Sequence, residues 1–275
     1  MGIICGHTYL DFEKRTHIMG ILNVTPDSFS DGGLFFNKDK AIAHGEKMAE
    51  EGADIIDVGG ESTRPFSTPV PLEEEIRRVI PVIRELAKRL KVPISIDTYK
   101  SEVAKRALGE GAAMVNDISA MRFDPEMANV VHEFRAPIIL MHMKGTPQDM
   151  QISPHYDSLV PEIIDFLKER ISVARNRGIP EGNIIVDPGI GFGKTRDHNL
   201  LIIRELKRFK VLGRPILVGT SRKAFIGDVL GTDDRDVGTY ATIAACVLNG
   251  ANIVRVHRVK ESKEITQMID AIKRA

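Results

Sequence analysis

The chain has 275 residues, of which 43% are hydrophobic and 28% charged, a composition typical of one large α/β domain that buries its core without disulfides or structural metals. Its 38 basic and 38 acidic residues give a formal net charge of zero, which argues against a nucleic-acid partner and requires any anion site to be built locally. The sequence predicts a cytoplasmic protein without a membrane partner, because its start lacks a signal-peptide pattern, no apolar run reaches about 18 residues, and Cys5 and Cys246 form no motif.

Short apolar runs rich in β-branched residues recur along the chain. They span residues 17–24, 54–58, 93–97, 113–116, 136–141, 183–187, 214–219 and 251–256. Each run is almost continuously apolar, as expected for a strand that is covered on both faces. Segments with helical spacing lie between them, and the clearest, residues 72–90 and 157–177, carry their apolar side chains on one stripe.

This alternation of strands and helices predicts a parallel sheet. An open, doubly wound sheet would also fit, but so many strand–helix repeats in one domain of this length favour a closed (β/α)8 TIM barrel. No linker, low-complexity tract or internal repeat divides the sequence. We therefore expect residues 1–275 to form a single domain.

Polar side chains stand at the carboxyl ends of most of these strands. They are Asn23, Asp57, Asp97, Asn116, His142, Asp187, Ser221, Arg222, Lys223, Arg255 and His257. A barrel gathers all of these strand ends on one rim, where barrel enzymes carry their active sites. A single aspartate after one strand would be explained equally well as a helix cap. Repetition over most of the strands indicates a functional rim.

The residue types on this rim suit a polar ring that carries a phosphorylated group. Carboxylates and amides can read the donor edge of a heterocycle, and cations can hold a phosphate or diphosphate. The acceptors are Asp97, Asn116 and Asp187, and the cations are Lys223, Arg255 and His257. Asn23 with the nearby Asp31 offers oxygen ligands of the kind that Mg²⁺ prefers.

Two segments that combine glycine with polar residues, 31–33 and 59–65, follow the first two strands. They are explained either as ordinary connections or as lids that exclude water from the reactants. The sequence does not decide between these interpretations.

Motifs along nearly the whole chain, in order, resemble those of the dihydropteroate synthases. Residues 19–33 (MGILNVTPDSFSDGG) resemble the first signature of that family and residues 57–65 (DVGGESTRP) the second. Further matches are SIDT at 95–98, ND at 116–117, MHMKGTP at 141–147, DPGIGFGK at 187–194, SRK at 221–223 and VRVH at 254–257. Each motif alone is weak, but together they are specific. Arg258 and Ala120 depart from the family pattern, at positions that touch no matched site residue.

The resemblance implies a single-barrel enzyme of folate biosynthesis. Such an enzyme joins 6-hydroxymethyl-7,8-dihydropterin diphosphate to p-aminobenzoate by an SN1-like route, giving 7,8-dihydropteroate and pyrophosphate. The resemblance also implies a Mg²⁺ cofactor and a homodimer, although the sequence itself does not reveal the oligomeric state.

Site roles follow from the same resemblance, position by position. The pterin would be held by Asp97, Asn116, Asp187 and Lys223, with Met141 and Phe192 beside the ring. The diphosphate would be bound by Asn23, Thr63, Arg255 and His257, with Mg²⁺ on Asn23 and help from Asp31. The p-aminobenzoate pocket, where sulfonamides bind in this family, would be formed by Phe29, Arg64, Pro65, Phe192, Ser221 and Lys223.

Two other functions stay open at this point. A pterin-dependent methyltransferase that binds methyltetrahydrofolate has a similar barrel, but it is not expected to retain residues 221–223 together with both glycine-containing segments. A non-catalytic pterin-binding paralogue would be expected to lose one of those segments, and both are present.

Overall fold

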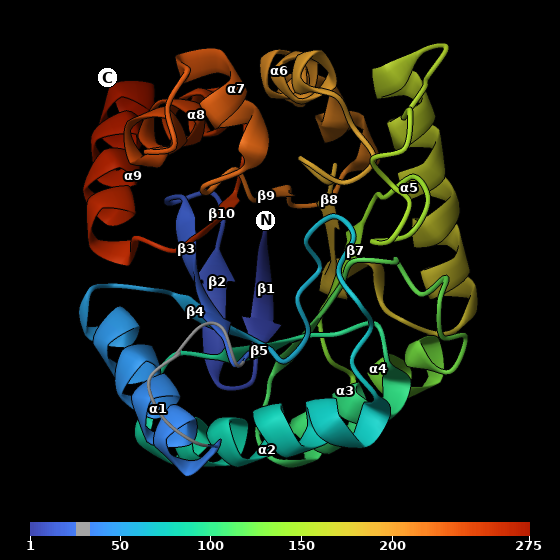
Figure 1. Cartoon of the computed structure of the whole chain (residues 1–275), viewed down its shortest axis with the longest axis vertical. Helices are drawn as coiled ribbons and strands as arrows, with labels where there is room; N and C mark the ends of the chain where they lie inside the picture. The colour runs from blue at the N-terminus through green and yellow to red at the C-terminus, as the bar shows by residue number, and fades with distance from the viewer. Residues whose placement is uncertain (26–33) are drawn as a thin grey trace.

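The computed structural model describes residues 1–25 and 34–275, without the side chains of residues 34–37, and its centre is a parallel sheet rolled into a barrel with helices around it (Figure 1). The strands of this sheet are β3 His17–Asn23, β4 Ile55–Gly59, β5 Ile94–Asp97, β6 Met114–Asp117, β7 Ile138–Met141, β8 Ile184–Asp187, β9 Leu217–Val218 and β10 Ile253–Val256. They are hydrogen-bonded in the order β8-β7-β6-β5-β4-β3-β10-β9. A parallel bridge between Val186 and Ile216 joins the two ends, so the predicted (β/α)8 barrel is confirmed.

Helices cover the outside of the barrel. They are α1 Leu34–Glu50, α2 Leu72–Arg89, α3 Ser101–Gly109, α4 Met127–Phe134, α5 Leu159–Asn176, α6 Arg196–Arg204, α7 Ala224–Leu230, α8 Asp236–Leu248 and α9 Val259–Arg274, with 3₁₀ turns η2 Glu181–Asn183 and η3 Leu206–Leu212. Helix α2 begins directly after Pro71, and its glutamates in the first turn and basic residues in the last turn both complement the helix dipole. Its apolar stripe is buried, as the sequence pattern predicts.

An N-terminal hairpin, which the sequence analysis did not predict, closes the amino end of the barrel. It consists of β1 Gly2–Cys5 and β2 Thr8–Asp11, paired antiparallel with Ile3 opposite Leu10. Ile3, Cys5, Leu10 and Phe12 form one buried cluster with the side chains that the strands point inward near their first residues. Those inward residues are Met19, Ile55, Met114, Ile139, Ile185, Leu217 and Ile253.

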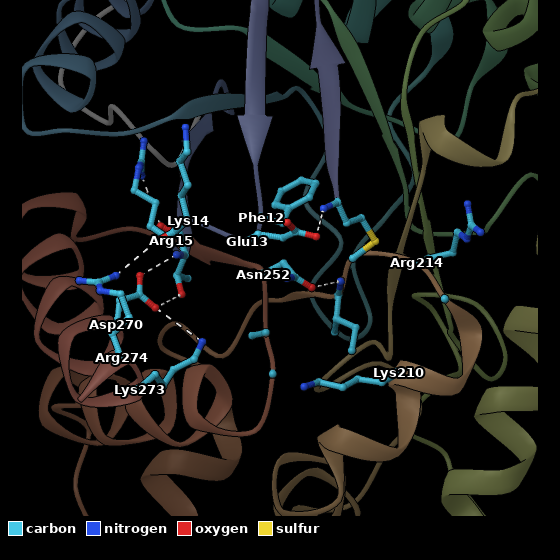
Figure 2. A pocket seen from close by; sticks show the side chains of 16 residues that line it. Phe12, Glu13, Lys14, Arg15, Lys210, Arg214, Asn252, Asp270, Lys273 and Arg274 are labelled. Carbon is cyan, nitrogen blue, oxygen red and sulfur yellow. Dashed lines mark hydrogen bonds and ion pairs between the residues drawn. The ribbon is translucent and has the colours of Figure 1, made fainter.

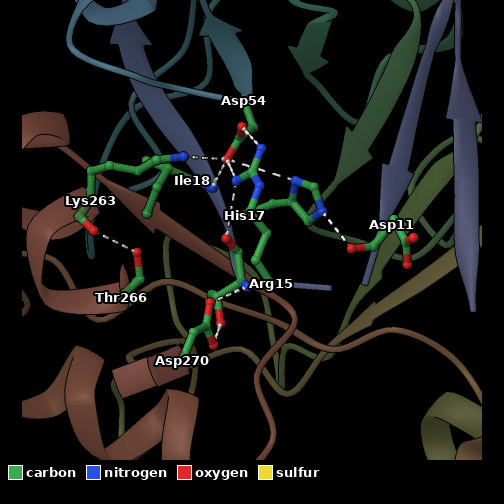
Figure 3. Close-up of polar contacts among 9 residues, drawn as sticks. Asp11, Arg15, His17, Ile18, Asp54, Lys263, Thr266 and Asp270 are labelled. Atoms are coloured by element: carbon green, nitrogen blue, oxygen red, sulfur yellow. Dashed lines mark hydrogen bonds and ion pairs between the residues drawn. The ribbon is translucent and has the colours of Figure 1, made fainter. Parts of the chain in front are cut away.

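A polar network joins the chain segments at this amino end (Figure 3). Asp54 accepts hydrogen bonds from Arg15 Nη1 at 2.7 Å and from the Ile18 N–H at 2.8 Å, and it lies 3.4 Å from Lys263 Nζ. Burial alone would raise the pKa of Asp54, but Arg15, the Ile18 N–H and Lys263 hold it below its ordinary value. Asp54 therefore ties β3 and β4 to α9 as a carboxylate.

Replacing Asp54 with asparagine is expected to lower the free energy of unfolding by about 2 kcal/mol, because charge-assisted hydrogen bonds are lost and Lys263 keeps no carboxylate there. Since the folded pKa is depressed, this stabilisation is complete above the ordinary pKa of aspartate and is lost as the pH falls through the lower folded pKa. Urea unfolding at pH 7 measures the change. The control is Asp165→Asn, whose side chain is 74% exposed; equal unfolding midpoints for the two variants would contradict the prediction.

A cavity of about 490 Å³ opens at the same end and is lined by many basic side chains (Figure 2). Most of its charges have partners: Arg15 binds Asp54, Arg214 binds Glu181, and Lys273 lies near Asp270. Charge pairing at the amino end of a barrel serves stability, whereas barrel enzymes place their chemistry at the opposite rim.

Candidate active site

The register of the strands brings predicted site residues next to one another at the carboxyl end of the barrel. Asp97 on β5 is the partner of Asn116 on β6, and Met141 on β7 is the partner of Asp187 on β8. Asn23, the half-buried last residue of β3, lies beside Gly59 of β4. Side chains on one face of a strand recur every second residue, so the inward Ile55, Ile185 and Ile253 at the amino end are followed on the same face by Asp57, Asp187 and Arg255.

Arg255 is the centre of a buried polar cluster. Its Nε donates to Asp57 Oδ2 and its Nη2 donates to Asp97 Oδ2, both at 2.6 Å. Asn116 Nδ2 donates to the same Asp57 oxygen at 3.0 Å. Asp57, which is fully buried, therefore orients both Arg255 and Asn116. The Nη1 group of Arg255 makes no hydrogen bond within the described residues and stays available to a ligand.

The two carboxyl groups that are predicted to hold the pterin, Asp97 and Asp187, have pKa values close to neutral pH. Burial raises the pKa of Asp97 to about 7, with Arg255 opposing the shift and Asp57 adding to it. Burial raises the pKa of Asp187 to about 6, opposed by the Gly189 N–H, which donates to Asp187 at 2.7 Å, and by Lys223. A ligand that donates hydrogen bonds to these carboxylates would favour their ionised forms.

Lys223 and Phe192 form an amphipathic wall of the site. The Lys223 ammonium lies 4.1 Å from the centroid of the Phe192 ring, and burial together with Arg255 lowers the pKa of Lys223 to about 8. Phe192 belongs to a buried apolar cluster with Met141 and Ile118, a surface that suits the face of a flat ring. Gly191 has φ +80°, and a Cβ there would lie 3.1 Å from Lys223 Cδ, so glycine leaves room for the lysine stem.

Ser221 and His257 meet at the neighbouring strand ends. Ser221 Oγ lies 2.8 Å from His257 Nδ1 and also accepts the His257 N–H at 3.3 Å. Burial, and then Arg255 and other cations nearby, lower the pKa of His257 to about 4. The sequence analysis treated His257 as a cation, but without a bound anion its imidazole is neutral at pH 7, so it would serve a phosphate as a hydrogen-bond donor.

The connection from β4 to α2, residues 60–71, is called the second loop here. Thr63 is half-buried in it, whereas Arg64 and Pro65 are exposed. Arg64 lies close enough to the strand ends to lower the pKa of both Lys223 and His257. The Phe66 N–H donates to the Pro147 carbonyl at 2.9 Å, which links the loop to the connection after β7.

Two predicted site residues, Phe29 and Asp31, lie outside the described residues. Among the residues that the structure describes, no group of three or more His, Cys, Asp or Glu side chains could hold a metal ion. Asn23 alone suits a Mg²⁺ ion that takes its other ligands from water and from substrate phosphates.

Comparisons with known proteins agree with this geometry. A profile of the family described as "Pterin binding enzyme" matches residues 19–257. The dihydropteroate synthase of Synechocystis sp. is 48% identical over 270 residues, which cover 97% of this chain and 93% of that protein. The chain belongs to the dihydropteroate synthase family.

Solved structures of this family superpose closely on the barrel. The Xanthomonas albilineans dihydropteroate synthase with 4-aminobenzoic acid has a TM-score of 0.94 and 43% identity, covering 100% of this chain and 98% of that chain. The Yersinia pestis dihydropteroate synthase in a sulfonamide drug complex has a TM-score of 0.95 and 40% identity, covering 100% of both chains.

This family member also contains a buried pair to which sequence reasoning gave no role. Lys194, 2% exposed, donates from Nζ to His142 Nδ1 and to the Phe192 carbonyl, both at 2.9 Å. Burial lowers the pKa of Lys194 to about 7, and burial and Lys194 lower that of His142 to about 2, so His142 is a neutral acceptor. The pair holds the turn that presents Phe192. Its signal in the sequence was only that both residues lie in matched motifs.

Proposed function

We infer that the chain catalyses the reaction of its family. It is a transferase of folate biosynthesis that joins 6-hydroxymethyl-7,8-dihydropterin diphosphate to p-aminobenzoate and releases pyrophosphate. The observation that carries this inference is full-length similarity to a dihydropteroate synthase, with 97% of the chain covered. No observation favours the methyltransferase or the non-catalytic paralogue.

The pterin is proposed to bind over the Arg255 cluster. Asp97, Asn116 and Asp187 accept hydrogen bonds from its donor edge, while Met141 and Phe192 pack against its ring. Support comes from the burial of Asn116 and Asp187, from the low exposure of the Asp97 side chain, which is 11%, and from the apolar cluster beside them. A buried acceptor set rejects rings that lack matching donors, because its polar groups would then stay unpaired.

The diphosphate is proposed to bind where positive charge gathers. Arg255 offers Nη1 without releasing Asp57 or Asp97, His257 donates a hydrogen bond, and Thr63 adds a hydroxyl. Asn23 would hold Mg²⁺, and the ion would supply charge neutralisation to the leaving group. The resemblance assigns a supporting role to Asp31, which lies outside the described residues. These groups stabilise the negative charge that grows on the leaving oxygen.

The bond that breaks joins the pterin methylene carbon to the diphosphate oxygen, which keeps the electron pair. The dihydropterin delocalises the positive charge left on the carbon, and ionised Asp97 stabilises that charge electrostatically. The amine of p-aminobenzoate then attacks the carbon, and its proton reaches the solvent once the loop opens to release the products. Because water would trap the cation, the second loop is proposed to exclude it.

The p-aminobenzoate pocket is proposed to lie under the second loop. Arg64 and Pro65 come from that loop, Ser221 and Lys223 from the connection after β9, and Phe192 from the connection after β8. Phe29 completes the pocket in the prediction and lies outside the described residues. The position of Arg64 near Lys223 and His257 supports a shared cationic site for the carboxylate.

We propose a cytoplasmic homodimer. Exposed apolar side chains gather on the neighbouring helices α6, α7 and α8, and they include Leu200, Val229, Leu230, Val237 and Leu248. No helix within the described ranges has the length and apolar character that a membrane crossing requires. Val237, 71% exposed, is the test position.

Light scattering is expected to find a dimer for the parent and a monomer for Val237→Glu, because a charge would be buried in the proposed interface. Met268→Glu on α9, where the side chain is 64% exposed, is the matched control and should stay dimeric. A parent that is monomeric would overturn the proposed dimer.

Pyrophosphate release by the purified protein tests the proposed activity. Release is expected to require the pterin diphosphate, Mg²⁺ and p-aminobenzoate together, and a sulfonamide is expected to inhibit it. Tight pterin binding without release would instead support the non-catalytic paralogue or the methyltransferase.

A further inference from the structure

The base of the second loop closes on one lysine from the next connection of the barrel. Lys100, between β5 and α3, places its ammonium 2.5 Å from Glu61 Oε2, 2.5 Å from Glu75 Oε2 and 2.8 Å from the Val70 carbonyl. The three protons of the ammonium group are therefore all used. The side chains of Lys100, Glu61 and Glu75 are only 18%, 7% and 1% exposed.

Glu61 joins the two ends of the loop. Besides Lys100, it accepts the Val70 N–H at 3.0 Å and the Tyr99 hydroxyl at 2.8 Å. Both backbone polar groups of Val70 are thus held, its N–H by Glu61 and its carbonyl by Lys100. Residues 61 and 70 are fixed side by side, and the exposed part between them carries Thr63, Arg64 and Pro65.

The same lysine connects this loop to the pterin side of the site. Lys100 follows Asp97 by three residues, and its own N–H donates to the Thr98 hydroxyl at 3.2 Å. The segment 97–100 therefore places Asp97 against Arg255 at the barrel centre and binds the second loop through Lys100 at the rim.

The base of the second loop depends on the positive charge of Lys100, which neutralises Glu61 and Glu75. Glu61 and Glu75 are both buried, and neither has another ion-pair partner within the described residues. Without the ammonium, two buried carboxylates would face each other across the base of the loop. Repulsion and the demand of each for water would open that base.

We propose that Lys100 is a positioning residue for p-aminobenzoate: by joining Glu61, Glu75 and Val70 it fixes the second loop over the substrate. The inference rests on the proposed function, because it assumes that this loop covers the p-aminobenzoate pocket. Lys100 itself touches no reacting atom. Its largest effect is expected in the binding of p-aminobenzoate, because Arg64 and Pro65 come from this loop, whereas the proposed acceptors of the pterin ring stand on the strands.

The test compares Lys100→Met with the parent enzyme in steady-state kinetics and pterin binding. The KM for p-aminobenzoate is expected to rise by about tenfold or more, as misplacement of substrate-contacting groups predicts. The inhibition constant of a sulfonamide should rise by a similar factor. The dissociation constant of 6-hydroxymethyl-7,8-dihydropterin, which lacks the diphosphate that Thr63 would hold, should change by less than about threefold, since Asp97 and Arg255 are untouched.

Lys100→Arg, which keeps the charge, is expected to recover most of the parent KM. Lys105→Met, an exposed lysine on α3, is the matched control and should leave every constant unchanged. If Lys100→Met does not fold, Tyr99→Phe carries the test, because it removes one donor to Glu61 and should raise the same KM more weakly.

Two results would overturn the proposal. One is a folded Lys100→Met enzyme with the parent KM for p-aminobenzoate. The other is a folded Lys100→Met enzyme that loses affinity for the dihydropterin without diphosphate as strongly as for p-aminobenzoate, which would mean a general structural role. A parent that releases no pyrophosphate would instead refute the proposed function.

Discussion

An Asp97→Asn enzyme is expected to lose at least about 100-fold in kcat while keeping its fold, an effect in the range of losing one preorganised electrostatic contact. The substitution keeps the shape of the side chain and an acceptor for Arg255 Nη2, but it removes the negative charge beside the pterin. Asp57 still holds Arg255 Nε, so the cluster should survive. What is lost is the stabilisation of the cation that forms when diphosphate leaves.

Stability at alkaline pH separates this effect from misfolding. Burial raises the folded pKa of Asp97 to about 7, so this group's contribution to stability falls as the pH rises from the ordinary aspartate pKa to about 7, and the full loss persists at higher pH. The asparagine variant carries no such charge and should be at least as stable as the parent at pH 8. Urea unfolding and single-turnover pyrophosphate release measure the two quantities, with Asp165→Asn as the charge-removal control. A folded, fully active variant would refute the role of Asp97.

The barrel was predictable because its signal is local. Each strand from β3 to β10 coincides with a mainly apolar run, because strands covered on both faces are mostly apolar, and the polar residues within them gather toward their carboxyl ends. The run predicted over residues 214–219 forms a strand only at Leu217 and Val218, next to the bridge between Ile216 and Val186. The hairpin β1–β2 has no comparable signal: Ile4 and Tyr9 are exposed, and its burial depends on inward residues from strands distant in the sequence.

The site was predictable as a list of residues but not as a set of contacts. Strand-end positions identified Asp97, Asn116, Asp187 and Arg255 before any geometry was known. The roles of Asp57 and Lys100 depend on partners that only the closed barrel brings near. Arg255, for example, contacts Asp57 across 198 positions of sequence. The neutral state of His257 likewise follows from burial and surrounding cations, which no motif encodes.

Lys223→Ala is expected to lower kcat/KM by at least about 100-fold, the range seen when one preorganised electrostatic contact is removed. Lys223 is half-buried beside Phe192 and close to Asp187, Asp97 and Arg255, so its ammonium would serve both proposed substrate sites. Of the three cations that lower the pKa of Asp187, the substitution would remove Lys223 and leave Lys194 and Arg255. The variant should fold, because the loss of a lysine with a lowered pKa relieves an unfavourable burial of charge.

The pH dependence of the parent gives a second, independent readout of Lys223. The folded pKa of Lys223 is lowered to about 8, so kcat/KM should fall as the pH rises through that value and the ammonium is lost. Protonation of Asp97, with a pKa of about 7, and of Asp187, at about 6, should lower kcat/KM on the acid side. In Lys223→Arg the alkaline fall should move to higher pH, because a guanidinium stays charged there. An alkaline fall at the same pH in parent and Lys223→Arg would show that another group titrates and would remove Lys223 from the proposed site.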